Sequence, residues 1–360
     1  MSYRGLRPAL FIYFFISSPA DARVYDMFRS DSPRGAFCDA IGGACAADIA
    51  VENAFFQNPA VLATGESDWN FDGDIAQKSN LEPGSDPGNL ISQTESNGGV
   101  GVSSGRFGVG ASMTWQKDTV EGKLTIFDEN ELPLLTKMST SANLFQFSLP
   151  LAYLVSPMLS IGLTPSLYKH DQSLNIPNST DASGSNLSAK GFGLKFGMLY
   201  QPSDRLRVGS WFGIPTTLYE SQTFSAQVQS TSINYSEDFA LHFPWVWALG
   251  GAFDTAGGFS FFAENDLIGP TYHGNLLSYD TLSSASDGKN KSSVGKGRKV
   301  VAQPHWGVRK ILSRKFTAHF GGYFETARAE GFAGRLHTSA VTLFPFWTRF
   351  LSPTALESVS

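Results

Sequence analysis

The sequence predicts an all-β protein, a transmembrane antiparallel β-barrel, from three observations. Apolar side chains recur at every second position in many segments after residue 66. The connections between these segments alternate between short turns and long polar stretches. Only 16% of the 360 residues are charged, against about 25% in an average soluble domain, and 36 are glycine. Outer-membrane barrels show this combination, because their strands alternate lipid-facing and lumen-facing side chains and contain no long apolar run.

Residues 1–22 have the features of a secretory signal peptide. Arg4 and Arg7 supply a positively charged start, and residues 9–16 form an apolar core that is too short to span a bilayer as a helix. Ala20-Asp21-Ala22 fits an A-x-A cleavage site. The alternative is a buried strand or helix of a cytosolic protein. No later stretch reaches about 18 uninterrupted apolar residues, so we expect no transmembrane helix.

The segment Gly191–Tyr200 illustrates the strand pattern. Phe192, Phe196 and Met198 fall on one face, whereas Lys195 and three glycines fall on the other. One face is therefore suited to lipid and the other to a lumen. Similar segments flank short turns rich in Pro, Gly, Ser and Asp near residues 156–157, 201–204, 254–258 and 313–315. Long polar connections are expected at residues 78–96, 118–140, 171–186, 220–237 and 271–297.

This layout gives about twelve strands, and the barrel is expected to extend over residues 66–350. A polar tail, residues 351–360, follows it. The last strand candidate, His337–Phe350, contains Pro345. Proline has no N–H for the strand ladder, so this position predicts an edge or a bulge.

Residues 23–65 do not follow the alternating pattern. A Gly/Ala-rich run starting at Gly35 leads to the acidic residue Asp48, the pair Phe55-Phe56 and the tripeptide Asn58-Pro59-Ala60. Pro59 fixes its own φ and biases Asn58 toward an extended conformation, so we expect a rigid turn here. The Asn58 side-chain amide can hydrogen-bond backbone groups of a barrel wall. The alternative is a simple turn that leads into the first strand.

Both cysteines of the chain, Cys38 and Cys45, lie in this segment. In an oxidising compartment a pair at this spacing can form a disulfide, worth roughly 2–3 kcal/mol on the chain-entropy model. Two small buried thiols are the alternative. We expect no metal site, because no second pair of ligands accompanies the cysteines and the six histidines are scattered. No cofactor is expected.

Two further signals argue against other classes of protein. Residues 101–105 have the G-x-S-x-G spelling around Ser103, but a strand follows where a hydrolase nucleophile elbow needs a helix. The net charge of −5 shows no basic excess, so we expect no nucleic-acid partner. We therefore predict a protein that is not an enzyme.

Several ionisable residues fall on predicted strands, where charges have to point into the lumen because an Arg on the lipid face costs roughly 2–4 kcal/mol. They need no catalytic role to explain them. These residues are Arg205, Arg207, Glu264, Asp266, His305 and His319.

The order of features in residues 23–65 resembles the N-terminal hatch of FadL-type outer-membrane transporters of long-chain fatty acids and other hydrophobic compounds. The resemblance is sharpest at Asn58, Pro59 and Ala60, the three residues that map one for one. It implies a monomeric barrel of up to fourteen strands in a Gram-negative outer membrane, with the hatch plugging its lumen. We call residues 23–65 the hatch.

The resemblance also implies a function, passive transport of hydrophobic compounds gated by the hatch. The implied partners are a hydrophobic small-molecule substrate, outer-membrane lipid and the barrel assembly machinery. Phe55 and Phe56 would then offer apolar surface along the ligand path. Two other functions stay open, a structural or adhesive outer-membrane barrel and an outer-membrane lipid hydrolase.

Overall fold

The computed structural model describes residues 38, 40–64, 69–81, 90–127, 133–175, 184–228, 231–270, 300–313, 316–325 and 335–345. Nearly all of them form one antiparallel sheet. The hatch holds a short α-helix, α2, and a 3-10 helix, η2. In the described residues no helix has the length and apolar character to cross a membrane. The elements are α2 Val51–Phe56, η2 Pro59–Ala63, β1 Trp69–Leu81, β2 Leu90–Ser104, β3 Phe107–Phe127, β4 Pro133–Ser148, β5 Leu151–Ser156, β6 Leu159–Asn175, β7 Gly184–Ser203, β8 Leu206–Gly213, β9 Thr216–Val228, β10 Thr231–Phe243, β11 Val246–Asp254, β12 Phe259–Ile268, β13 Val301–Ser313, β14 Phe316–Glu325 and β15 Arg335–Pro345.

The fifteen strands occupy twelve positions in the sheet. Twelve of them follow one another along the hydrogen-bonded path from β1 to β15, and β5, β9 and β10 lie off that path. Each of these three continues a neighbouring strand across a two-residue interruption. Pro150, Pro215 and Pro244 stand at the three interruptions, where the missing N–H leaves a gap in the ladder. The predicted number of about twelve to fourteen strands is confirmed.

Four of the five predicted long connections are wrong, because strand occupies half or more of each one in the described residues. β1 and β2, for example, stay paired as far as Leu81 and Leu90. β3 and β4 likewise stay paired from Ser112 to Phe127. Their outer parts are rich in polar residues, and for that reason they were predicted as connections.

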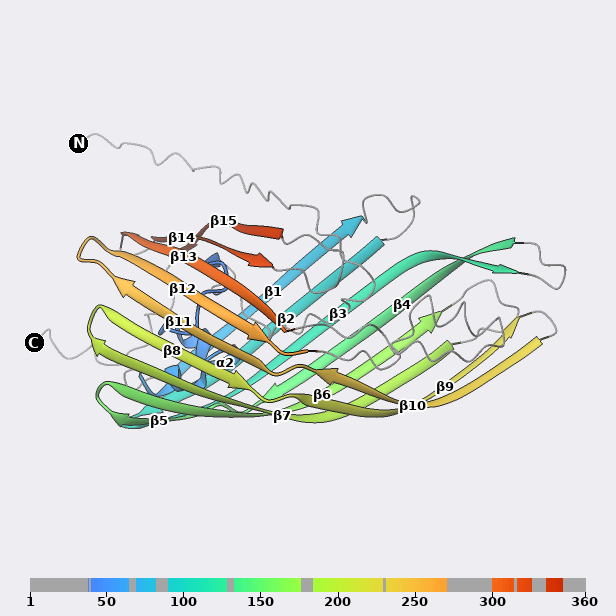
Figure 1. Cartoon of the computed structure of the whole chain (residues 1–360), viewed down its shortest axis with the longest axis horizontal. Helices are drawn as coiled ribbons and strands as arrows, with labels where there is room; N and C mark the ends of the chain where they lie inside the picture. The colour runs from blue at the N-terminus through green and yellow to red at the C-terminus, as the bar shows by residue number, and fades with distance from the viewer. Residues whose placement is uncertain are drawn as a thin grey trace, which may run out of the picture.

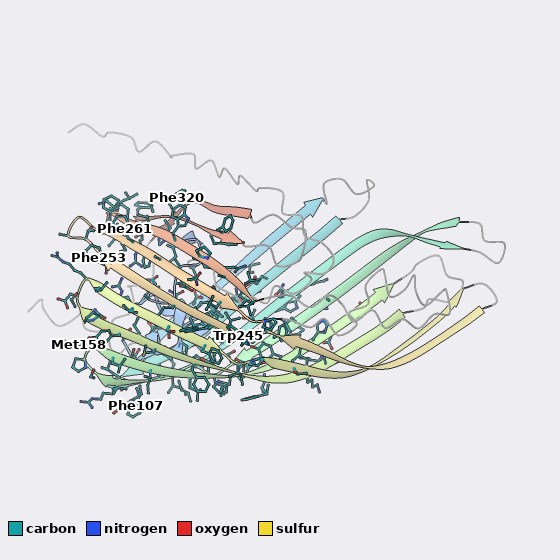
Figure 2. All side chains as sticks on the ribbon, viewed as in Figure 1. Phe107, Met158, Trp245, Phe253, Phe261 and Phe320 are labelled. Atoms are coloured by element: carbon teal, nitrogen blue, oxygen red, sulfur yellow. A yellow bond between two sulfur atoms is a disulfide. The ribbon has the colours of Figure 1, made fainter. Side chains whose placement is uncertain are left out.

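The sheet carries its apolar side chains outward and its polar ones inward, the reverse of a soluble protein. Phenylalanines on many strands face outward, and Figure 2 shows the labelled Phe107 and Phe320 on opposite sides of the molecule. Lys195, Arg207 and Glu264 point inward. The face assignment predicted for Gly191–Tyr200 is confirmed, because Phe192, Phe196 and Met198 are exposed. A surface of this kind requires an apolar solvent such as lipid.

The sheet curls around the hatch. Hatch atoms touch inner-wall glycines on β2, β3, β6, β7, β8, β13 and β14. Figure 1 shows the hatch, in blue, within the end of the sheet that holds the short turns. The largest buried apolar cluster consists mainly of hatch residues. The molecule's core is therefore the hatch and its contacts with the wall.

The predicted boundaries at the two ends of the chain can be compared with the structure only in part. The predicted signal peptide, residues 1–22, and the predicted tail, residues 351–360, lie outside the described residues. The last strand candidate begins earlier than predicted, at Arg335, and its described part ends at Pro345. Pro345 pairs with Phe316 at the end of the β14–β15 ladder, where proline is tolerated.

Candidate functional site

The hatch is held in shape by its own backbone and by a disulfide. Cys38 and Cys45 are bonded to each other, with their Cα atoms 5.6 Å apart. The chain between them turns through Gly42 and Gly43, both with positive φ, which glycine adopts without strain. Both sulfur-bearing residues are fully buried. The disulfide thus closes a tight loop inside the sheet.

Asn58 joins two parts of the hatch to the wall. Its side-chain Nδ2 donates to the carbonyl of Ala46 at 2.7 Å and to the carbonyl of Met198 on β7 at 3.0 Å. Its Oδ1 accepts from the N–H of Ala60 at 3.2 Å and caps η2, which begins at Pro59. Asn58 has an extended backbone, as expected of a residue before proline. One buried side chain therefore satisfies three backbone groups.

Glycines on the inner wall allow this close approach. A Cβ at Gly197 would overlap the Asn58 side chain, and a Cβ at Gly162 would overlap the backbone of Pro59 and Ala60. On β8, Gly209 lies against the backbone of Ala46 and Ala47. Other strands repeat the arrangement. The remaining wall glycines in close contact with the hatch are Gly99, Gly101, Gly108, Gly110, Gly307 and Gly321.

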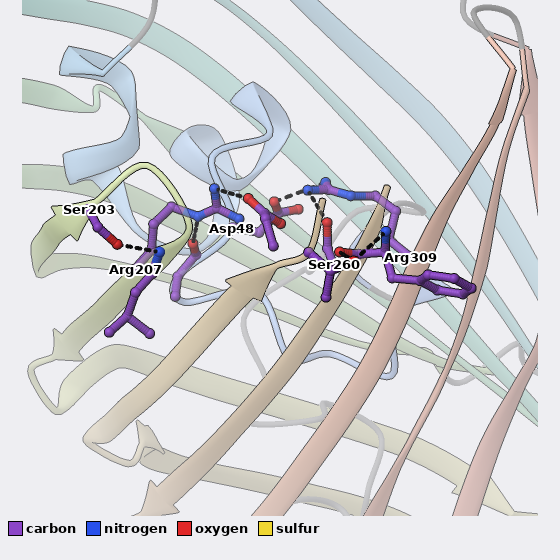
Figure 3. A network of polar contacts seen from close by, with 10 residues as sticks. Asp48, Ser203, Arg207, Ser260 and Arg309 are labelled. Carbon is purple, nitrogen blue, oxygen red and sulfur yellow. Dashed lines mark hydrogen bonds and ion pairs between the residues drawn. The ribbon is translucent and has the colours of Figure 1, made fainter. Parts of the chain in front are cut away.

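Charged side chains hold the hatch on the side formed by β8, β12 and β13. Arg207 donates through Nε to the carbonyl of Ala47 at 3.2 Å and is paired with Asp254 at 2.6 Å. Arg309 is paired with the buried Asp48 at 3.1 Å. Figure 3 shows the two arginines on either side of Asp48. This side of the hatch is fixed by polar bonds.

Two further wall residues, Glu264 and His305, also make polar contacts with the hatch. The Oε2 of Glu264 accepts from the N–H of Ala46 at 2.5 Å. His305 Nδ1 lies 2.7 Å from the carbonyl of Gly42, and its Nε2 lies 3.4 Å from Asp266. Glu264, Asp266 and His305 all face inward, as predicted for lumen residues.

The opposite side of the hatch is mostly apolar. The ring of Phe55 lies against Gly99, Gly101 and Gly110 of β2 and β3, and its carbonyl accepts from Ser112. The carbonyl of Phe56 accepts from Lys195 at 2.6 Å. Both rings are buried, so they pack between hatch and wall. Phe55 and Phe56 offer no open apolar surface in this arrangement.

The other sequence candidates lie apart from any catalytic arrangement. Ser103 lies near the end of β2, and a turn and a second strand follow it, as predicted. His305 and His319 both face inward, but they pair with Tyr323 and Arg309 and do not stand opposite each other. Over the part of the chain that the structure describes, no three His, Cys, Asp or Glu side chains group as metal ligands.

Sequence reasoning missed the residues that bind the hatch from the wall. Lys195 and Arg207 could have been found from the sequence, because a charged residue within an apolar strand is expected to face inward. Nothing local marks Arg309 as the partner of Asp48, since 261 residues separate them in the chain. The sequence showed which glycines face inward, but it did not show that the hatch backbone packs against them.

No protein-family model and no curated protein matches this chain. The fold is similar to solved structures of hydrocarbon channels. The toluene transporter TbuX of Ralstonia pickettii matches with a TM-score of 0.62 and 14% identity, over 87% of this chain and 89% of that one. The toluene transporter TodX of Pseudomonas putida matches with a TM-score of 0.59 and 13% identity, over 81% and 83%.

A structure described as the CymD monoaromatic hydrocarbon channel matches with a TM-score of 0.57 and 12% identity, over 89% of each chain. All three structures are described as transporters or channels. The all-β antiparallel fold implied by the FadL-type resemblance is confirmed.

Proposed function

We propose that this protein carries hydrophobic compounds passively across the outer membrane of a Gram-negative cell through a barrel gated by its hatch. The fold shared with toluene transporters and a monoaromatic hydrocarbon channel supports this function. The outward apolar surface supports a membrane location. On this proposal residues 1–22 direct export, the barrel assembly machinery inserts residues 66–350 as a monomer among outer-membrane lipids, and residues 23–65 form the gate.

The observation that carries the proposal is the seating of Asn58. Its amide bonds to Ala46 within the hatch and to Met198 in the wall, so a single side chain couples the fold of the hatch to its docking. A net gain of about 1 kcal/mol per hydrogen bond is small enough for a ligand to offset. A hydrophobic compound that binds better beside a displaced hatch would therefore shift the equilibrium toward the open barrel.

Substitution of Asn58 tests the gate. Asn58→Ala, and separately deletion of residues 35–60, should change uptake of radiolabelled toluene by cells. Barrel assembly should persist in both variants, seen as heat-modifiable mobility on SDS gels. Thr64→Ala, which removes one hydroxyl bond to the carbonyl of Val61 inside the hatch, is the matched control. Unchanged uptake in both variants at normal surface levels would remove the hatch from the mechanism.

An adhesive or structural barrel is the second candidate, favoured by the long paired hairpins. The β3–β4 ladder extends to Phe127 and Pro133, whereas a spanning strand needs about 9–11 residues. Such a hairpin projects surface beyond the membrane. If shortening it by residues 119–141 abolished attachment of cells to surfaces and left toluene uptake intact, adhesion would be the better reading. A lipid hydrolase has no comparable support, because Ser103 lies near the end of β2 and is followed by a turn and a strand where a nucleophile elbow needs a helix.

A further inference from the structure

Three rows of inward-facing residues cross β8, β11, β12 and β13, one beyond another. The first row touches the hatch and consists of Gly209, Gly250, Glu264 and His305. The second row lies one step farther from the short turns and consists of Trp211, Ala248, Asp266 and Gln303. The third row consists of Gly213, Val246, Ile268 and Val301. The second row therefore also borders the hatch, because Trp211 lies in one buried cluster with the hatch residue Ala46.

Within the described residues, two members of the second row are buried polar side chains that lack a hydrogen-bond partner. Gln303 is fully buried, and neither its amide nitrogen nor its amide oxygen meets a partner in the described part of the chain. Trp211 is 3% exposed, and its indole N–H likewise meets none there. Buried polar atoms of native proteins are nearly always paired, so each unpaired one calls for an explanation.

Trp211 has mainly apolar neighbours. Trp211 packs in one buried cluster with Val246, Ala248, Ile268 and the hatch residue Ala46. Ala248, between Trp211 and Asp266 in the row, has the smallest side chain that still carries a Cβ. The apolar side chains beside Trp211 are suited to contact with an aromatic ring.

Charges beside the row are balanced and already engaged. The Lys195 ammonium lies 4.7 Å from the centre of the Trp211 ring and donates to the Phe56 carbonyl. On the other side Asp266 is paired with His305 at 3.4 Å. A cation and an anion thus flank the unpaired groups, so a ligand carboxylate would gain from one and be repelled by the other. An uncharged group that both donates and accepts suits the site better.

We propose that Trp211 and Gln303 bind the hydroxyl group of an uncharged aromatic alcohol, with its ring against Val246 and Ile268. The hydroxyl oxygen accepts from the indole N–H of Trp211, and the hydroxyl proton is donated to the amide oxygen of Gln303. Three strand spacings, roughly 14 Å along the wall, separate the two backbones, so the proposal requires the two side chains to converge on one hydroxyl group over Ala248 and Asp266. The inference rests on the proposed transport function and narrows its substrate class to oxygenated compounds.

Three probes with the same ring and side carbon separate the alternatives, namely toluene, benzyl alcohol and benzoate. Their binding is measured by equilibrium dialysis of radiolabelled compound against the protein in lipid nanodiscs, with empty nanodiscs subtracted. The readout is the Kd of benzyl alcohol divided by the Kd of toluene. This ratio cancels any effect of a substitution that changes the binding of both compounds equally.

Removal of one polar partner should raise this ratio roughly tenfold, the effect of one hydrogen bond. Trp211→Phe keeps the ring and removes the N–H, and Gln303→Met keeps the length and removes the amide. Trp247→Phe is the matched control, because Trp247 is exposed on the outer face of β11, where its N–H donates to Ser210. The control should leave the ratio unchanged. Heat-modifiable mobility verifies folding of each variant.

The outcomes separate the two proposals. Toluene binding with the same ratio in wild type, Trp211→Phe and Gln303→Met would overturn the hydroxyl site and leave the transport proposal standing. Benzoate binding more tightly than benzyl alcohol to the wild-type protein would also overturn it, in favour of an anion site at Lys195. Failure of all three probes to bind the wild-type protein would overturn both proposals.

Discussion

Arg309 on β13 and Asp48 in the hatch form an ion pair of 3.1 Å in which the carboxylate has no exposed surface. Arg309 also donates to Ser260 at 3.3 Å and lies over the ring of Phe262. The arginine is thus positioned by the wall, and the carboxylate is carried by the part that would move. Displacement of the hatch has to separate the pair.

Removal of Arg309 should therefore loosen the hatch. Arg309→Met leaves Asp48 as a buried charge without this partner, at a cost of about 3 kcal/mol to the closed arrangement. We expect more frequent conductance steps of the purified protein in planar lipid bilayers. The double variant with Asp48→Asn should return conductance toward wild type, since no charge is then left buried. Equal conductance in wild type and Arg309→Met would show that the pair does not hold the hatch closed.

The wall glycines provide a purely steric test of docking. A Cβ at Gly209 would overlap the backbone of Ala46 and Ala47, whereas the nearest atom to a Cβ at Gly213 is 3.8 Å away, an ordinary contact. Both residues lie on β8 and neither has a positive φ. Gly209→Ala should displace the hatch and raise conductance, and Gly213→Ala should not. Conductance that rises equally in both variants would mean that the glycines serve the strand and not the hatch.

The sequence predicted some parts of the strands correctly and missed others. Phe196 and Lys195 were placed correctly outside and inside, because lipid on one face forces strict alternation. The outer halves of β3 and β4 were missed, because their many polar residues indicated a connection. Local backbone rules also succeeded at Asn58, whose extended conformation follows from Pro59.

The candidate site was only partly predictable for a different reason. The hatch sequence drew attention to Asn58, and its bond to the Met198 carbonyl is of the kind predicted. Its acceptor lies 140 residues away in the chain, as does most of what holds the hatch. Contacts of that separation depend on how the sheet closes around the hatch, which no local pattern encodes. The gating role of Asn58 stays a prediction.

The outer face of the sheet should tolerate a charge near the short turns but not midway along a membrane-spanning strand. Phe196 lies on the outer face of β7, and an Arg there would cost roughly 2–4 kcal/mol if it reached the middle of the bilayer. Phe196→Arg should lower the amount of folded, heat-modifiable protein in outer-membrane fractions. Met158→Arg, at the exposed turn between β5 and β6, is the matched control, where the cost falls to about 0–1 kcal/mol. Equal yields of the two variants would place Phe196 outside the hydrocarbon.

The disulfide between Cys38 and Cys45 should stabilise the hatch without supporting the barrel. Its loop contains Ile41, whose backbone lies against Gly307 and Gly321 of the wall. Replacing both cysteines by serine opens the loop and forfeits roughly 2–3 kcal/mol on the chain-entropy model. Amide hydrogen exchange of hatch peptides should then be faster, while peptides from β6 and β7 should exchange as in wild type, because their ladders do not involve the loop.

Two measurements make that prediction decisive. Mass spectrometry of unreduced, alkylated wild-type protein should find neither thiol labelled, and full labelling without reductant would show that the bridge is absent in the cell. The double serine variant should keep heat-modifiable mobility, because the wall's hydrogen bonds run from strand to strand and bypass the loop. If instead the barrel itself failed to assemble, the hatch would be a folding template for the sheet as well as its gate.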